Sequence, residues 1–554
     1  MKKSILSLVA ICFAIGLFAQ EEMPLVWEGK AEHSITRTGT GLEGEISYVA
    51  NDKEITVFKN DDGSVVWSNK FKELAPNLRK IDELEPFWDS EVIFLFDRKV
   101  GKDQIACINL SDGKLLWTTD KYQNVYEESL LYVREKDAFA ITLKDGLVFV
   151  NAKTGEELWR TAHFKGAVGK YIYNGADETI TMMNFQASGL AALFTGMKNQ
   201  IMRLDINTGE VIWQQTYIGR AQRKVISREF LFDLQLSEDK VVLRLNGIQV
   251  YDYKTGTPLW SAAFNFTADK VAKKPGGVGK VTKFGVYGAV ADPVEDGNFF
   301  YVLDMSSKKS QYVKKYDKNT GKLIWTSPEI KGGARAIPNM YVADGTVVLQ
   351  IGGAVEVQYH AVKTTTTSSG TTTETVTAIT TQMVKPMGVQ AFDAQNGAFK
   401  WESERFKKGI TNMVYHNGDI LVCSGKAYYG MEANSGKEKF EVNVKDDGNG
   451  LATRIFEHNG KLVVVGEKGI SLYSLEEGGK LIKANKYKKS DLEQIEGDIM
   501  IMKTAKADIA AFDLNDASFT EFKARKGATT FLSRTADYVY IYEKKKMKKV
   551  KTKG

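Results

Sequence analysis

Short runs of β-forming residues alternate with polar turns along almost the whole chain. Residues 145–159 show one such unit: an apolar run, Leu147–Val150, leads into an Asn-Ala-Lys-Thr-Gly turn, and a shorter run ends in Trp159. Strands separated by so few residues pair as antiparallel neighbours. The pattern therefore predicts an all-β chain of short hairpins, without the helical periodicity of an α-solenoid.

The hairpin unit is repeated, and a glycine followed four residues later by a tryptophan identifies each clear copy. With 49 Gly and 9 Trp in 554 residues, chance placement would give about one such pair, so seven pairs indicate an internal repeat of about 40 to 50 residues. The pairs are Gly63/Trp67, Gly113/Trp117, Gly155/Trp159, Gly209/Trp213, Gly256/Trp260, Gly321/Trp325 and Gly397/Trp401.

The turn before each tryptophan follows a D-x-x-T-G frame, complete at Asp205–Gly209, Asp252–Gly256 and Asp317–Gly321. An Asp side chain accepts hydrogen bonds from backbone amides within the turn, and glycine adopts φ > 0 without a Cβ clash. The following Trp offers a large apolar surface to a neighbouring sheet. We therefore interpret the repeated Gly and Trp residues as structural elements and not as a ligand site.

Degenerate copies continue the repeat towards the C-terminus. Phe440 and Ile482 occupy the Trp position of two later copies, and the segment Asp513–Phe519 keeps the turn without its glycine. Trp27 marks the first copy at the N-terminal end. The repeat therefore extends over essentially the whole chain.

The frame D-x-x-T-G-x-x-x-W resembles the repeat of the pyrroloquinoline-quinone-like β-propellers, which include quinoprotein alcohol dehydrogenases and an outer-membrane assembly scaffold lipoprotein. The resemblance implies a single large all-β propeller of four-stranded antiparallel blades over residues 21–554. Family precedent implies eight blades, with ten as the upper alternative from the number of marked positions. Leu25–Trp27 is expected to complete the last blade by pairing with strands within Tyr538–Val550, which removes exposed sheet edges.

The first 20 residues have the composition of a secretory signal peptide. Lys2 and Lys3 precede an apolar segment, Ile5–Phe18, and cleavage is predicted after Ala19 or Gln20. We therefore expect an exported, unlipidated, bacterial protein of the periplasm or the extracellular space. No further apolar run is long enough to predict a transmembrane helix in the mature chain.

The net charge of +6 comes mainly from the chain ends. Residues 543–554 hold seven Lys and one Glu. A basic end on a nearly neutral body is not the basic face that nucleic acid requires, so we expect no nucleic-acid partner. We interpret the tail as a solvated end, with binding to anionic lipid as the alternative. Cys107 and Cys423 lie in apolar runs and are interpreted as buried thiols, a disulfide being the less favoured alternative.

Three segments interrupt the repeat, near residues 186–200, 270–293 and 360–386. The first is small and apolar, and the second is rich in glycine. The third contains a stretch, Thr364–Thr381, that is nearly all Thr, Ser and Gly, with Glu374 as its one charged residue. Long loops on a rigid scaffold commonly carry binding sites. The stretch 186–197 is the best candidate for contact with a partner or a membrane surface, whereas the Thr-rich segment is expected to be a β-hairpin or a disordered insertion.

The sequence holds no recognisable motif for catalysis or metal binding. Its five histidines have no paired spacing, and C-x-x-C, C-x-x-C-H and G-x-S-x-G are absent. The adjacent cysteine pair that a quinoprotein dehydrogenase would carry is also absent. We therefore predict no catalytic, cofactor-binding or metal-binding residues. Trp88 is the one tryptophan outside the repeat, and ordinary packing is its favoured interpretation.

The sequence thus favours a monomeric, non-enzymatic, exported propeller that binds a protein or cell-envelope partner through loops on one face. The fold alone does not determine function. A quinone-dependent dehydrogenase-like enzyme and a small-ligand sensor, each using the central funnel, stay open as alternatives.

Overall fold

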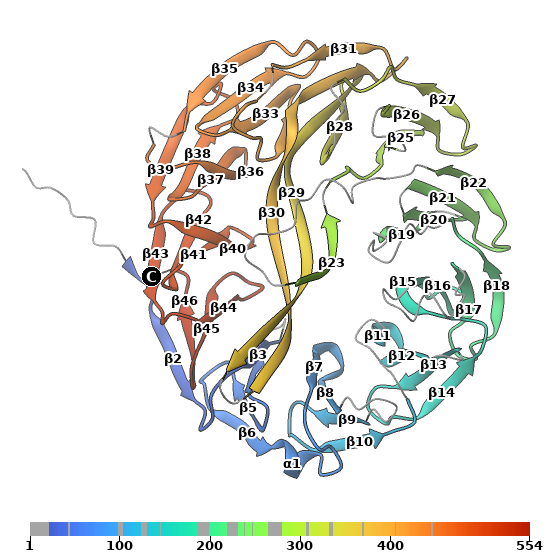
Figure 1. The fold of residues 1–554 in the computed structure, drawn as a ribbon, viewed down its shortest axis with the longest axis vertical. Helices are drawn as coiled ribbons and strands as arrows, with labels where there is room; N and C mark the ends of the chain where they lie inside the picture. Colours follow the sequence, from blue (N-terminus) through green and yellow to red (C-terminus); the bar gives the residue numbers. More distant parts are fainter. Residues whose placement is uncertain are drawn as a thin grey trace, which may run out of the picture.

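The strands form eleven sheets that are arranged as a closed ring (Figure 1). The computed structural model describes residues 21–553 except 42–44, 98–103, 123–129, 144–145, 186–198, 219–230, 238, 246, 264–279, 288, 306–309, 332–335, 368–369, 405 and 445–446. In each sheet the first strand lies nearest the ring centre and the fourth lies on the outer rim. The predicted fold class, a large all-β propeller of four-stranded antiparallel blades, is confirmed.

Blades 1 to 6 follow one another along the chain. Their strands are β3 (Arg37–Thr40), β4 (Ile46–Ala50), β5 (Glu54–Lys59) and β6 (Val65–Lys70) in blade 1; β7 (Glu83–Phe87), β8 (Val92–Asp97), β9 (Gln104–Asn109) and β10 (Leu115–Thr119) in blade 2; β11 (Leu130–Val133), β12 (Ala138–Leu143), β13 (Gly146–Asn151) and β14 (Glu157–Thr161) in blade 3; β15 (Ala167–Asn174), β16 (Thr179–Phe185), β17 (Ile201–Asp205) and β18 (Val211–Gln215) in blade 4; β19 (Leu231–Ser237), β20 (Lys240–Leu245), β21 (Gly247–Asp252) and β22 (Pro258–Ala263) in blade 5; and β24 (Val294–Asp296), β25 (Phe299–Asp304), β26 (Tyr312–Asp317) and β27 (Leu323–Thr326) in blade 6.

Blades 7 to 11 complete the ring. Their strands are β28 (Asn339–Ala343), β29 (Thr346–Thr367), β30 (Gly370–Asp393) and β31 (Phe399–Glu402) in blade 7; β32 (Met413–His416), β33 (Asp419–Ser424), β34 (Ala427–Glu432) and β35 (Glu438–Asn443) in blade 8; β36 (Ala452–His458), β37 (Lys461–Gly466), β38 (Gly469–Ser474) and β39 (Leu481–Lys486) in blade 9; β40 (Ser490–Glu496), β41 (Ile499–Thr504), β42 (Asp508–Asp513) and β43 (Phe519–Lys523) in blade 10; and β44 (Thr529–Leu532), β45 (Tyr538–Glu543), β46 (Lys546–Lys551) and β2 (Leu25–Lys30) in blade 11. Among the described residues, the elements outside this pattern are β1 (Glu21–Glu22), β23 (Lys280–Tyr287), the helix α1 (Phe71–Leu74) and two 3₁₀ turns, Trp88–Ser90 and Arg134–Lys136.

The ring closes where the sequence predicted. Strand β2 pairs antiparallel with β46, with Leu25 opposite Val550 and Trp27 opposite Lys549. Since the N-terminal strand completes the C-terminal sheet, each copy of the repeat, including the copy at Trp27, belongs to one blade of a closed ring. The blade number is therefore eleven, and not the eight or ten that precedent and spacing gave.

The lysine-rich C-terminus is part of this closure, so its interpretation as a solvated end was wrong. In β46, Met547 and Val550 are fully buried, and the Lys549 ammonium donates to the carbonyl of Asn60 in blade 1 at 2.9 Å. Two apolar residues stand among four lysines in this strand, and lysine stems add apolar surface of their own. The strand that was expected within Tyr538–Val550 therefore includes lysines that composition had assigned to a solvated end.

The core is divided among the interfaces between blades. Eleven clusters of buried apolar side chains each join two neighbouring blades. Phe149 of blade 3 and Met182 of blade 4 share one such cluster, and Trp27, Phe58 and Tyr540 share the cluster between blades 11 and 1. Because each blade packs on two neighbours, the ring needs no single central core.

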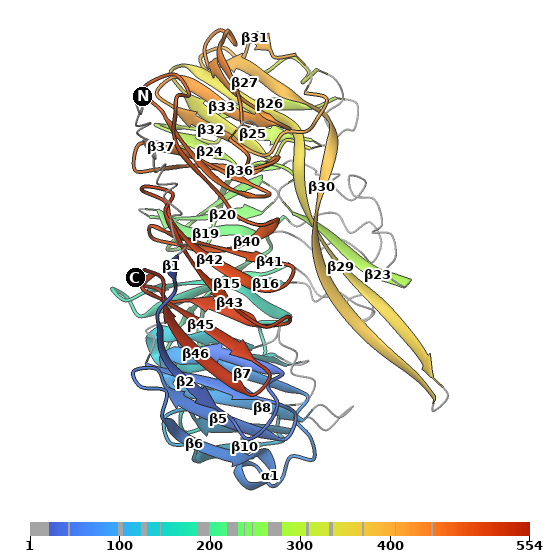
Figure 2. The ribbon, with the colours of Figure 1, turned by 90° about the vertical axis from the view of Figure 1, so that its left-hand side faces the viewer.

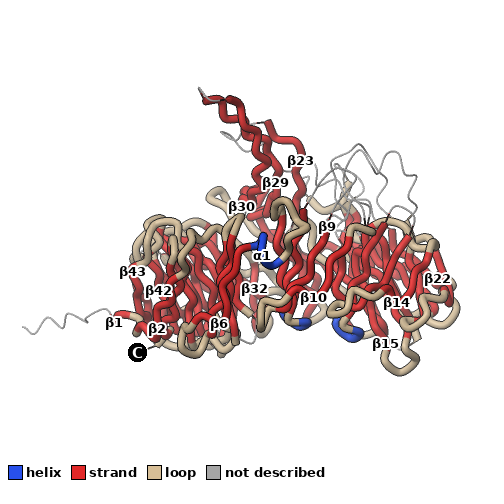
Figure 3. The backbone as a smooth tube through the Cα atoms, turned by 90° about the horizontal axis from the view of Figure 1, so that it is seen from below, coloured by secondary structure: helices blue, strands red, loops and turns tan. Residues whose placement is uncertain are grey.

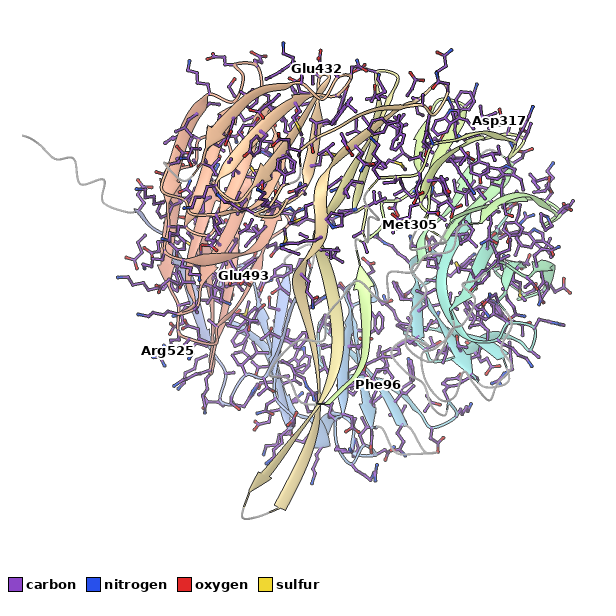
Figure 4. All side chains as sticks on the ribbon, turned by 45° about the horizontal axis from the view of Figure 1, so that its top comes forward. Phe96, Met305, Asp317, Glu432, Glu493 and Arg525 are labelled. Atoms are coloured by element: carbon purple, nitrogen blue, oxygen red, sulfur yellow. The ribbon has the colours of Figure 1, made fainter. Side chains whose placement is uncertain are left out.

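The repeated turns have the geometry that their sequence predicted. Asp317 Oδ1 accepts hydrogen bonds from the backbone amides of Asn319 (3.0 Å) and Thr320 (2.8 Å), and Gly321 has φ +68°. The backbone hydrogen bond from Thr320 is the main reason that the pKa of Asp317 lies below its usual value. Figure 4 shows Asp317 and Glu432, the first turn residues of blades 6 and 8, at the periphery of the ring.

Each turn glycine contacts the tryptophan of the preceding blade and not the one four residues later in its own hairpin. A Cβ on Gly256 would lie 2.5 Å from the Trp213 ring. The Trp213 indole N–H donates to the carbonyl of Tyr253 in the same turn at 2.9 Å, and the side chain is 6% exposed. The pairs that share this ring-on-glycine contact are Trp27–Gly63, Trp67–Gly113, Trp117–Gly155, Trp159–Gly209, Trp213–Gly256, Trp260–Gly321, Trp325–Gly397, Trp401–Gly436 and Phe440–Gly479.

Blade 9 departs from this rule. The strand register places Lys483, and not Ile482, at the Trp position, because Lys483 opposes Leu472 just after the β-bulge that also precedes the tryptophans of other blades. Ile482 is 50% exposed. The next turn carries Ala517 at φ +59° in place of glycine. Without a large ring on the preceding blade, a Cβ is tolerated at this position.

The indole hydrogen bond gives a direct test of the contact between blades. Among the described residues, Trp260 Nε1 is buried without a hydrogen-bond partner, whereas Trp213 Nε1 has one. Trp213→Phe should therefore lower the free energy of unfolding by about 0.5–1.5 kcal/mol more than Trp260→Phe, measured by urea denaturation. Equal losses would show that the indole bond does not contribute.

The C-terminal residues give a second test. Thr552 is 2% exposed; its hydroxyl donates to Ala536 O at 2.7 Å, and its carbonyl accepts from Thr520 Oγ1 at 2.6 Å. Removal of residues 552–554 should cost about 1–3 kcal/mol, because both bonds are lost. Lys551→Gln, which removes an exposed charge, should be nearly neutral. A truncated protein with the wild-type urea midpoint would contradict the expected role of these contacts in closure.

Candidate partner-binding face

The four-strand order places two kinds of connection on opposite faces of the ring. Turns from first to second strand and from third to fourth strand lie on one face, which we call the turn face. Connections from second to third strand, and from each blade to the next, lie on the other, which we call the insertion face. All three sequence insertions fall in connections of the second kind, between β16 and β17, between β22 and β24, and between β29 and β30.

The insertions differ in how far the structure describes them. Residues 186–198, the best sequence candidate for a contact, lie outside the described residues. Residues 264–279 do as well, but β23 follows them at Lys280–Tyr287. The Thr-rich segment was expected to be a β-hairpin or a disordered insertion. It forms the end of the β29–β30 hairpin, so the first of these expectations is confirmed.

The β29–β30 hairpin and β23 form a three-stranded arm that projects from the insertion face (Figures 2 and 3). β29 has 22 residues and β30 has 24, and pairing runs without interruption from Gly353 and Val384 to Thr367 and Gly370. At about 3.3 Å per residue, the part beyond Gly353 is on the order of 45 Å long. The arm is therefore the largest departure from the ring among the described strands.

A glycine pair fixes the base of the arm. The strand register shifts between Ile351 and Gly353, and Gly352 and Gly353 have φ of +66° and +104°. A Cβ on Gly352 would lie 2.0 Å from the carbonyl oxygen of Pro386. A β-bulge with glycine bends a strand, so this site sets where the arm leaves blade 7. The Gly-Gly pair within a β-rich run is the signal in the sequence that would have located it.

A groove of about 760 Å³ lies beside the arm base, between blades 7 and 8. Phe406, Tyr429 and Met431 contribute apolar surface, and Phe406 and Tyr429 rings are 5.3 Å apart. The Phe406 amide donates to Met387 O, in β30, at 3.0 Å. The loop after β31 thus connects the groove to the arm.

Negatively and positively charged side chains both line the groove. Its carboxylates are Glu402, Glu404, Glu438 and Glu441, and its ammonium groups are Lys407, Lys408 and Lys426. The Tyr429 hydroxyl donates to Glu441 Oε1 at 3.2 Å. Burial, and after it the Glu441 charge, raises the pKa of Tyr429 above its usual value. A lining that combines apolar side chains with both signs of charge suits a polypeptide better than a uniformly charged polymer.

The remaining candidate residues are dispersed. His416 Nδ1 lies 3.1 Å from Glu457 and His458 Nε2 lies 2.7 Å from Asp498, and each pair links neighbouring blades at the turn face. Trp88 stacks on Tyr48 with ring centroids 6.0 Å apart. Cys107 and Cys423 are buried free thiols in blades 2 and 8. Within the part of the chain that the structure describes, no three His, Cys, Asp or Glu side chains gather as metal ligands.

Of the residues that the sequence singled out, the structure describes the repeated Gly and Trp residues but not the predicted cleavage residues. The structure places the repeated Gly and Trp residues together at the blade interfaces, where their structural role is open to the substitution test above. Ala19 and Gln20, the predicted cleavage residues, lie outside the described residues. No described helix is long and apolar enough to cross a membrane.

Comparison with known proteins identifies the repeat. The family model described as outer membrane protein assembly factor BamB matches residues 51–225 and 184–268. Residues 51–268 of this propeller therefore match pyrroloquinoline-quinone-like repeats. The family resemblance predicted from the D-x-x-T-G-x-x-x-W frame is thereby confirmed.

Individual relatives of this propeller are distant. The tetrathionate hydrolase of Acidithiobacillus ferrooxidans is 23% identical over 286 residues, which cover 47% of this chain and 50% of that enzyme. The chain therefore spans half the length of this curated relative. The crystal structure of BamB from Moraxella catarrhalis shares 16% identity, covering 69% of this chain and 92% of that one with a TM-score of 0.28. The computationally designed Ika8 protein shares 12%, covering 72% and 100% with a TM-score of 0.32.

The glycine pair at the arm base generates a further test. In Gly352→Ala the new methyl group would meet backbone oxygens that cannot rotate away. Gly345→Ala is a matched control, because Gly345 has φ +69° and no atom within 4 Å of its Cβ position. Both substitutions incur positive-φ strain of about 1–3 kcal/mol, and Gly352→Ala should lose clearly more stability in urea. Equal midpoints would contradict a close-packed base.

Proposed function

We propose that the protein is a non-enzymatic, exported binding scaffold that holds a protein partner against its insertion face. The observation that carries this proposal is the arm, which projects from that face beside a groove of mixed charge. The BamB-like repeat supports a protein-binding scaffold at this coarse level. Export to the periplasm or the extracellular space rests on the composition of residues 1–20.

A rigid ring with one elaborated face is suited to presenting a binding surface. Eleven apolar interfaces hold the blades, and the glycine pair fixes the arm on blade 7. A preorganised surface loses little conformational entropy on binding. The partner would contact the arm base, the groove and the neighbouring loops together.

A hydrolase is the second candidate, because a tetrathionate hydrolase is among the relatives. The two functions make different demands on the protein. A hydrolase would turn over tetrathionate without any partner, whereas a scaffold would show position-specific contacts with another protein.

Site-specific photo-crosslinking tests the scaffold proposal. A photoreactive residue at Met383, which is 50% exposed at the arm base, should crosslink to a protein in cells, while the same residue at the exposed Lys254 on the turn face should not. Crosslinks from both positions, or from Lys254 alone, would overturn the proposal. Tetrathionate turnover by the purified full chain would favour the hydrolase instead.

A further inference from the structure

Most outer edges of the ring are protected against pairing with another strand. In ten of the eleven fourth strands, the register shifts just before the Trp position, as between Leu115 and Trp117 in β10. A β-bulge bends and twists an edge and interrupts its row of hydrogen-bonding groups. Proteins use this device to prevent edge-to-edge association.

The exception shows what happens at a regular edge. Strand β43 pairs with β42 without a register shift. On its other side it pairs with β1, with Glu21 opposite Thr520 and Glu22 opposite Glu521. The Met23 amide continues this contact by donating to Glu521 O at 2.9 Å. The unbulged rim edge is thus the one that carries an added strand.

The arm has one protected edge and one regular edge. The outer edge of β23 carries Lys280 and Lys283, and its register with β29 shifts between Val281 and Lys283. Strand β30 pairs with β29 along the whole arm. It pairs with β31 only at Gln390–Phe392, in the part of β30 that belongs to blade 7 and not to the arm. Among the described strands, none pairs with the outer side of β30 between Thr371 and Thr381.

The sequence of this β30 edge has none of the usual protective features. Residues 371–381 contain no Pro, Lys or Arg and a single charge, Glu374, and most of them are β-branched. Charged residues and prolines are the usual means of keeping a long edge unpaired. A regular, β-branched edge without them is a template for strand addition.

We propose that the outer edge of β30, over Thr371–Thr381, receives an extended strand of the partner protein by backbone pairing. This proposal rests on the function proposed above and specifies the contact. The partner is a polypeptide with a segment of about eight to ten residues free to extend, as distinct from a glycan or a lipid.

The register also indicates the side-chain pattern of that segment. Phe284, Tyr359 and Ala378 occupy one row across the three strands, and Val281, Ala361 and Val376 occupy another on the same face. Residues directly opposite each other share a face of the sheet. An added strand would continue this face, so alternate apolar residues are expected in it.

A peptide probe tests backbone pairing directly. The probe is the fluorescent peptide Lys-Val-Thr-Val-Thr-Val-Thr-Val-Thr-Val-Lys, and its control has the same side chains but N-methyl groups on alternate residues. Fluorescence anisotropy with the full mature chain should show binding of the first peptide and at least tenfold weaker binding of the second. Equal affinities would overturn the proposal, because N-methylation removes backbone donors and blocks one edge of the peptide strand while leaving its side chains unchanged.

Paired proline variants place the contact on β30. Neighbouring residues in a strand direct their N–H groups to opposite edges, so one of Thr377→Pro and Ala378→Pro removes an outward donor, while the other removes a bond to β29. The variant that keeps wild-type arm protection in hydrogen exchange should bind the peptide at least tenfold more weakly. If both variants loosen the arm, the N-methyl comparison on the wild-type chain decides whether the peptide binds by backbone pairing. Unchanged binding to both variants would overturn the proposal.

Two further outcomes separate this proposal from its alternatives. A stable dimer of the full chain in sedimentation that the peptide does not dissociate would indicate self-pairing of β30 and overturn the proposal. Crosslinks from Met383 that persist in both proline variants would keep the scaffold function and reject the edge as its contact. Loss of those crosslinks in the outward-donor variant alone would support the proposal.

Discussion

The structure depends on one contact that eight of the eleven blades make: the indole of one blade covers the turn glycine of the next. This contact joins neighbouring blades through both packing and a hydrogen bond, as Trp213 does with Gly256 and Tyr253. The glycine is required twice, for its positive φ and for the space of its missing Cβ. At the seam, Trp27 makes the same contact with Gly63, so ring closure uses the interaction that joins most of the other neighbouring blades.

Three blades add a cation to this contact. Arg203, Lys315 and Lys549 lie opposite the Trp in their sheets, and each donates to the carbonyl that the indole faces in the next blade. Burial lowers the pKa of Lys315 and of Lys549, with nearby carboxylates opposing the shift. The blade interface thus accommodates a charged group because a backbone carbonyl and an aromatic ring receive it.

The fold could be predicted from sequence because its main signal is local. The Asp and Gly of each turn and the alternation of each strand act within about 15 residues, and these determine the hairpin and hence the blade. The partner of each indole could not be predicted in this way, since Gly256 and Trp260 are neighbours in sequence whereas Gly256 and Trp213 meet only after blades pack. The same limitation concealed the number of blades. The pairing that closes the ring, Trp27 opposite Lys549, was predicted from the strand-like runs at the two chain ends, but the number of blades between those ends was not.

The candidate binding face was predictable in part. Composition located the Thr-rich insertion but did not distinguish a hairpin from an unstructured loop, because threonine satisfies the preferences of both. The groove around Phe406 and Tyr429 has no motif, since its residues come from separate strands and loops that only the ring brings together. By contrast, Gly352 and Gly353 were a readable signal of a bend within a long strand.

The distribution of edge protection connects the ring to its proposed task. A propeller of eleven blades has eleven rim edges, and unprotected ones would let copies associate through backbone pairing. The bulge before the Trp position protects ten of them, with the residue before each Trp left exposed, as Leu158 and Ile212 are. Since the bulge and the indole contact occur in the same short strand, one sequence feature both joins the blades and protects the rim. A regular edge could then be confined to the arm, held away from the rim, where strand pairing can serve recognition without linking one ring to another.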